Sequence, residues 1–139
     1  MRQLTKQQVF DGFAKHMAKQ KRRSIYPGGV LCGYRGPGRT RCGIGKFITN
    51  AQYNKDMEGQ SVRDILGPFK LAQFANCDTW MLGELQSIHD HECVEDYTMD
   101  RFHRRMKGLA KTLKLDTTVY LAQKYPKKWL APLKPKNWR

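Results

Sequence analysis

A run of residues near the middle of the chain has the side-chain types that bind metal ions or transfer protons, namely His89, Asp90, His91, Glu92 and Cys93. In one hypothesis His89 is a general base, and Asp90 or Glu58 orients its ring or binds a divalent cation, as in a metal-dependent nuclease. No recognised nuclease spacing accompanies these residues. The run is also typical of a polar helix end that leads into a loop, and the sequence favours this structural role for His89.

Cysteine and histidine are also the ligands of structural zinc, which takes four ligands in tetrahedral geometry. The residues available for such a site are Cys32, Cys42, Cys77, Cys93, His89 and His91. Neither a C-x-x-C nor an H-x-x-x-H spacing occurs among them, so we expect no cofactor, with zinc as the lesser alternative. Residues 1–23 are charged and do not resemble a secretion signal, which predicts reduced thiols, although Cys32 and Cys42 could bridge if oxidised.

The segment that would position these groups is 30–48, which has the strongest strand pattern and is predicted to form a β-hairpin. Its turn, Gly36-Pro37-Gly38-Arg39, has Pro at the position of fixed φ and Gly where a type II turn needs a positive φ. The expected register sets Cys32 opposite Cys42 and makes one face mostly apolar. The tip gathers three arginines that either contact an anion or simply face solvent, namely Arg35, Arg39 and Arg41.

Helical periodicity accounts for most of the remaining chain. A Thr5–Gln8 capping box precedes a helix over 6–20, and Thr98 precedes one over 99–114. Further helices are expected over 62–66, over 69–91 with a break near 76–78, and from Asp116 to Tyr125. The fold class is therefore α+β and mainly α, with four to six helices around the hairpin. We expect one globular domain over 1–126 and an extended basic tail over 127–139.

The net charge of +14 is large for 139 residues and is unevenly distributed. Lys and Arg outnumber Asp and Glu by eleven to one in 1–48 and by twelve to one in 101–139, whereas 49–100 has three against ten. Two basic ends favour a polyanionic partner, because cations that contact phosphates release counterions. No apolar run approaches the length of about 18 residues that spans a bilayer, so we expect a cytoplasmic protein with no membrane partner.

The helix over 99–114 carries the strongest functional signal. Its polar face holds six cations: Arg101, Arg104, Arg105, Lys107, Lys111 and Lys114. Like charges three or four residues apart destabilise an isolated helix by about 0.2–0.5 kcal/mol per pair, and no acidic residue within the face offsets them. Either a partner neutralises these cations, or the acidic middle of the chain packs beside them. The tail adds Lys127, Lys128 and Trp138, and a tryptophan there either stacks on nucleic-acid bases or packs on the core.

Two stretches resemble a motif of uncharacterised small proteins encoded by bacteriophages and bacteria. The first is Cys32-x-Tyr34-Arg35-Gly36, then Gly38 and Cys42-x-Ile44-Gly45, followed by Tyr53 and Met57-Glu58-Gly59. The second is Leu85-Gln86-x-Ile88-His89-Asp90. The resemblance covers roughly a third of the chain. It implies a viral origin and a host cytoplasm, and it supplies no established activity.

Composition and charge together predict a small basic, non-catalytic protein that binds nucleic acid or a host complex containing nucleic acid. One alternative is an inhibitor or adaptor that grips an acidic surface of a host protein with the same cations. A second is a metal-dependent nuclease built on His89. These hypotheses differ in whether the bound partner survives nuclease treatment and whether the protein turns over a substrate.

Overall fold

The computed structural model describes residues 2–25, 33–90, 98–131 and 133. Within these ranges the chain forms α-helices α1 (Lys6–Gln20), α2 (Val62–Ile65), α3 (Thr79–Asp90), α4 (Met99–Leu113) and α5 (Thr118–Ala122), with single 3-10 turns between them. Five residues named above as candidates lie outside the described ranges, namely Cys32, His91, Glu92, Cys93 and Trp138. Among the described segments, no helix is both long and apolar enough to cross a membrane.

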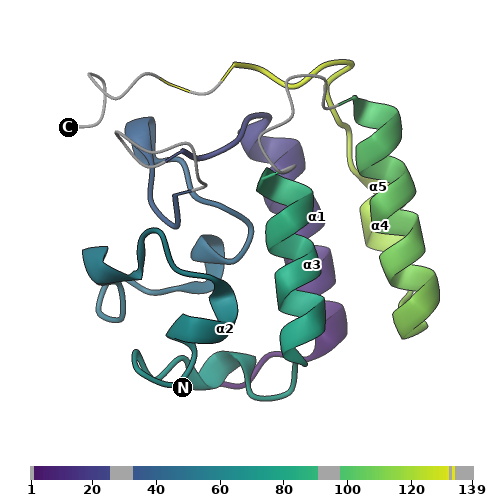
Figure 1. The fold of residues 1–139 in the computed structure, drawn as a ribbon. Coiled ribbons are helices and arrows are strands. Elements are labelled where there is room, and N and C mark those ends of the chain that lie inside the picture. Colours follow the sequence, from purple (N-terminus) through teal and green to yellow (C-terminus); the bar gives the residue numbers. More distant parts are fainter. Residues whose placement is uncertain (1, 26–32, 91–97, 132, 134–139) are drawn as a thin grey trace.

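Helices α1, α3 and α4 run side by side and carry most of the core (Figure 1). The chain enters α1 through the predicted capping box, in which the Thr5 side chain accepts from the N–H of Gln8 and the Gln8 side chain accepts from the N–H of Thr5. At the start of α4, the Thr98 hydroxyl accepts from the N–H of Arg101 at 3.2 Å. These caps satisfy amide groups that the first helical turn leaves unpaired. The predicted helices over 6–20 and 99–114 are therefore confirmed almost residue by residue.

The predicted β-hairpin over 30–48, and with it the α+β class, is wrong. Residues 33–48 contain no strand and form turns, with 3-10 turns at Pro37–Arg39 and Gly45–Phe47. The chain does reverse at the expected position, where Gly38 has a φ of 65°. A β-bridge joins Arg22 to Leu130 in parallel. The described part of the chain is therefore mainly α and contains no sheet.

A ladder does not form because distant side chains bind the backbone groups that it would use. The N–H groups of Tyr34 and Arg35 donate to the Glu58 carboxylate at 2.9 and 3.1 Å. On the returning side of the turn, the N–H of Arg41 donates to Gln20 Oε1 at 2.8 Å. Backbone groups that already have good partners gain little from exchanging them for cross-strand bonds.

Glycine lets the same segment lie directly on α1. A Cβ atom at Gly43 would lie 1.9 Å from the Phe13 ring, and one at Gly45 would lie 2.2 Å from the carbonyl oxygen of Tyr34. Both separations are far below van der Waals contact, so these positions require the absence of a side chain. Gly43 therefore allows close packing against α1, and Gly45 allows close packing within the segment itself.

The predicted helix over 69–91 is correct only in its second half. Helix α3 begins after Asp78, whose carboxylate accepts from the N–H of Met81 at 2.7 Å. Residues 69–78 instead form turns, because Gln73 is buried and binds other segments. The Gln73 side-chain amide donates to the carbonyl of Phe47 at 3.0 Å, and the backbone carbonyl of Gln73 accepts from the N–H of Leu4 at 2.8 Å. These long-range bonds replace the local bonds of a helix.

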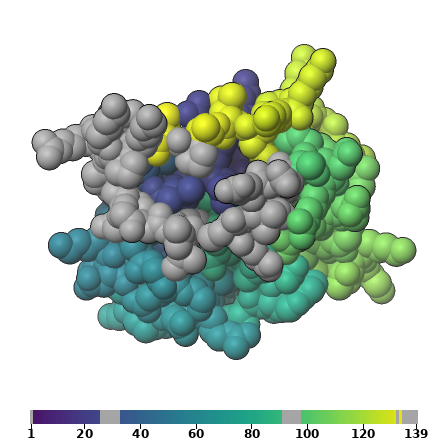
Figure 2. Space-filling view, turned by 45° about the horizontal axis from the view of Figure 1, so that its top comes forward, coloured from purple at the N-terminus to yellow at the C-terminus, as the bar shows by residue number. Residues whose placement is uncertain are grey.

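The last helix is also shorter than predicted, since α5 ends at Ala122. Tyr125 turns inward: its hydroxyl donates to the carbonyl of Ala14 at 3.1 Å, and its ring contacts Phe102. Trp129 packs on Phe102 as well, with ring centroids 5.0 Å apart. The first part of the tail is thereby held on the core, and its yellow atoms lie against both the purple atoms of α1 and the green atoms of α4 (Figure 2).

Candidate functional site

The exposed side of α4 carries more exposed cations than any other described helix. Phe102, Met106 and Leu109 point into the core, so the opposite side of the helix faces solvent. Five cations occupy that side and are called the α4 cationic face below: Arg101, Arg104, Lys107, Lys111 and Lys114. They extend over fourteen residues, about 20 Å along α4 and its C-cap residue Lys114.

The sixth predicted cation of this helix has a partner within the protein. Arg105 is half-buried, and its guanidinium donates to the Ser87 hydroxyl at 3.0 Å and to the Glu84 carboxylate at 3.5 Å. This is the packing of the acidic middle beside the helix that the sequence left open, and it involves Arg105. Arg104 and Lys107 have no ion pair with any residue in the described ranges, and the same holds for Lys111 and Lys114.

The arginines predicted to share a hairpin tip are separated by the structure. The Arg35 guanidinium lies 4.6 Å from the centre of the Tyr53 ring and donates to the carbonyl of Ile48 at 3.2 Å, so the protein itself holds it. Arg41 is half-buried beside α1, where its carbonyl accepts from Gln20 at 2.9 Å. Arg39 is exposed at the turn. Lys127 and Lys128 are exposed next to Trp129, close to the start of α4.

His89 has a structural environment. Its ring is fully buried, and its Nε2 accepts from the N–H of Ser24 at 2.9 Å. The proton therefore sits on Nδ1, which donates to the Asp90 carboxylate at 2.9 Å. With its ring buried and its Nε2 lone pair bound to the N–H of Ser24, His89 is positioned for a structural role. It joins the end of α3 to the segment that follows α1.

Glu58 lies in a second polar network and not beside His89. Its carboxylate accepts from the backbone N–H groups of Tyr34 and Arg35, and from the Tyr53 hydroxyl at 2.6 Å. Burial raises the pKa of Glu58, and the Tyr53 hydrogen bond partly offsets that effect. All three donors belong to the protein, so the carboxylate serves as an acceptor that joins segment 33–48 to Tyr53 and Glu58.

The two stretches that carry the family resemblance meet in this network. The Tyr34 hydroxyl donates to the carbonyl of Gln60 at 2.7 Å and accepts from the Gln86 amide at 2.9 Å. The Gln86 carbonyl oxygen accepts from the N–H of Val62 at 3.1 Å. Sequence reasoning had assigned no role to Tyr34 or Gln86. The quoted motif contains both residues and was the only sequence signal for them. Their hydrogen bonds hold a long segment in place without a sheet.

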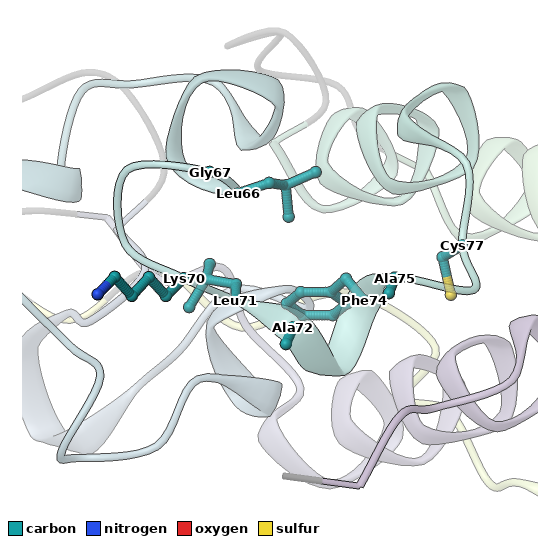
Figure 3. Close-up of a pocket in the computed structure, with 8 residues that line it drawn as sticks. All are labelled: Leu66, Gly67, Lys70, Leu71, Ala72, Phe74, Ala75 and Cys77. Atoms are coloured by element: carbon teal, nitrogen blue, oxygen red, sulfur yellow. The ribbon is translucent and has the colours of Figure 1, made fainter.

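An apolar hollow of about 440 Å³ lies between α2 and the turn at Ala72–Phe74 (Figure 3). Leu66 forms one wall, with Leu71 and Phe74 opposite, and the Cys77 thiol lies at the end of the hollow. Burial, reinforced by the nearby Asp78 carboxylate, raises the pKa of Cys77. A thiol that stays protonated is a poor nucleophile, so the hollow has no group suited to covalent chemistry.

The described residues contain no cluster of three or more metal-ligating side chains. Cys42 is buried, and its sulfur accepts from the N–H of Gly45 at 3.1 Å. Two of the proposed zinc ligands, Cys42 and His89, thus bind other parts of the protein. Comparison with protein-family models, curated proteins and solved structures finds no match to the chain.

Proposed function

We propose that this protein binds nucleic acid without catalysis, through phosphate contacts along the α4 cationic face. The observation that carries the proposal is a row of exposed cations on one side of a helix, of which Arg104, Lys107, Lys111 and Lys114 have no acidic partner in the described ranges. Lys127 and Lys128 extend the positive charge near the start of α4. We propose that the partner is met in the cytoplasm.

The arrangement has an energetic cost that a polyanion would remove. Successive cations of the face are three or four residues apart, which makes four neighbour pairs of like charge, three within α4 and one with Lys114 at its C-cap. At a few tenths of a kcal/mol per pair, the repulsion totals about 1 kcal/mol at low salt. Phosphate groups placed along the helix would turn this repulsion into attraction.

Salt dependence provides a quantitative test. If each of the five cations neutralises one phosphate, log K should fall with log salt with a slope of about −4.5 on duplex DNA and about −3.5 on a single strand. Raising salt from about 50 to 200 mM would then weaken duplex binding about 500-fold. Binding that barely changes over this range would refute the proposal.

Two variants with equal charge loss separate a local contact from a general effect of net charge. Arg104→Gln/Lys107→Gln/Lys111→Gln removes three cations from the face, and its slope on duplex DNA should fall to about −1.8. Its unfolding free energy should rise by about 1 kcal/mol, because all four repulsive pairs disappear. The matched control, Lys55→Gln/Arg63→Gln/Lys70→Gln, removes three exposed cations elsewhere and should keep the full slope.

A different outcome would support an inhibitor or adaptor that binds an acidic protein surface. In that case, a stoichiometric protein complex would be recovered from lysate after nuclease treatment. The three-glutamine variant of α4 would lose that complex, while purified DNA and RNA would bind the wild type weakly and without the predicted slope.

A further inference from the structure

A second cationic site lies at the other end of the core, where α1 ends. A hollow of about 490 Å³ is bounded by the last turns of α1, by the turn that contains Gly38 and Thr40, and by Leu133 of the tail. Its volume is in the range of pockets that hold small organic ligands, which begins at about 300 Å³. Segment 33–48 lies on the opposite side of α1 and α3 from α4 (Figure 1), so this hollow is separate from the α4 cationic face.

Positive charge dominates the lining. Lys19, Arg22 and Arg39 contribute to the wall, and none of the described lining residues carries a carboxylate. Lys19 and Arg39 are exposed and form no ion pair within the described ranges, while Arg22 reaches the carbonyl of Ala131 at 3.4 Å. His16 also lines the hollow, and burial lowers its pKa to about 4. The imidazole is neutral at physiological pH, so the charge of the site comes from the three cations.

The hollow is held in shape by contacts that do not involve these cations. Gln20 binds the Arg41 backbone through both its oxygen and its nitrogen, at 2.8 and 2.9 Å, which fixes the turn to α1. Leu133 sits directly over Gly38, where a Cβ atom would lie 2.2 Å from the Leu133 side chain. The N–H of Leu130 donates to the carbonyl of Lys21 at 2.8 Å and fixes the tail. A preformed site loses less entropy when it binds a ligand.

Arg39 is held at the rim in a backbone conformation that its residue type disfavours. Its φ is 62°, next to Gly38 at 65°. Outside glycine, this left-handed region is uncommon and strained. Glycine at position 39 would therefore relieve strain and remove a charge at once. This makes it possible to separate a role in binding from a role in folding.

We propose that this hollow binds a phosphate group, held by Lys19, Arg22 and Arg39. Three cations around a small space suit a phosphate monoester, whose charge at neutral pH is close to −2 and whose oxygens accept several hydrogen bonds. The phosphate belongs either to a small free molecule or to the 5′ end of a nucleic acid. The site is independent of the α4 cationic face, so either can fail without the other.

The test uses the full chain and three probes: inorganic phosphate, adenosine 5′-monophosphate, and a single-stranded oligonucleotide with and without a 5′-phosphate. Amide NMR shifts report the location of binding, and calorimetry reports the affinity. We expect phosphate and the nucleotide to shift the amides of residues 19–22 and 38–41. Arg39→Gly and Lys19→Gln should each weaken binding about tenfold or more, since each removes a charged hydrogen-bond donor. Lys15→Gln, one helical turn earlier and outside the hollow, is the matched control.

Preference for the 5′-phosphorylated oligonucleotide, lost in Arg39→Gly, would assign the site to nucleic-acid ends. Equal binding of the two oligonucleotides, with tight binding of the mononucleotide, would assign it to a small phosphate compound. Arg39→Gly should unfold at the same temperature as the wild type or higher, so lost binding cannot be ascribed to misfolding. The proposal is overturned if phosphate shifts no amide in this region, or if Arg39→Gly and Lys19→Gln both bind with wild-type affinity.

Discussion

Replacing Glu58 tests whether a side chain, and not a sheet, holds segment 33–48 in place. Glu58→Ala would leave the backbone N–H groups of Tyr34 and Arg35 and the hydroxyl of Tyr53 without their acceptor. An unsatisfied buried donor costs about 1–3 kcal/mol, and Tyr34 is fully buried whereas water can reach the other two. After allowance for the cost of burying the carboxylate, we expect the free energy of unfolding to fall by about 2–3 kcal/mol.

Urea denaturation followed by circular dichroism measures this loss, with three comparison variants. Tyr53→Phe removes one of the three donors and should cost about 1 kcal/mol. Glu58→Gln keeps one carbonyl oxygen and should lie between the wild type and Glu58→Ala. Asp56→Ala removes an exposed carboxylate two residues away and should be nearly neutral. A loss below about 1 kcal/mol in Glu58→Ala, or one no larger than in Asp56→Ala, would refute this account of the segment.

The pH dependence of stability gives a second test of the same carboxyl group. Because burial raises the pKa of Glu58 above its ordinary value of 4.5, the folded protein binds this proton more tightly than the unfolded chain does. The contribution of this group to stability is therefore full below the unfolded pKa and is lost as pH rises through the folded pKa. Glu58→Gln cannot titrate, so the stability difference between wild type and variant should change in this window. A constant difference from pH 4 to 7 would contradict the assignment.

Two further predictions concern buried histidines. His89→Ala should lower the free energy of unfolding by about 2–4 kcal/mol, because it opens a cavity and leaves the N–H of Ser24 without an acceptor. Nucleic-acid binding by this variant should be unchanged when it is measured below the melting temperature. Metal-dependent cleavage by the wild type that is lost in this variant at an unchanged melting temperature would restore the enzyme hypothesis. The pKa of His16 is lowered from 6.5 to about 4, so its contribution is full above pH 6.5 and is lost as pH falls toward 4, by at most about 3 kcal/mol. His16→Gln should flatten the stability curve measured by denaturation over this range, and an unchanged slope would contradict the prediction.

The sequence was sufficient to predict the helices whose backbone hydrogen bonds are made within the helix and its caps. Helix α4 was predictable because Thr98 caps it and its apolar residues repeat at helical spacing, and the capping box of α1 worked in the same way. The same periodicity places the cations of α4 on the solvent side. Their exposure therefore follows from the sequence by itself, since a helix that buries one side must present the other.

Only the tertiary structure decided which polar groups were already in use. Tyr34 and Arg41 looked like hairpin residues, but Glu58 and Gln20, distant in the sequence, hold their amide groups. Arg105 belongs to the same helix as the α4 cationic face, yet its guanidinium pairs with Glu84 of α3. Each of these outcomes depends on a contact between segments that no local pattern specifies. A backbone N–H that donates to a side chain cannot also donate across a β-ladder. Local sequence patterns do not specify which distant side chain will accept that hydrogen bond.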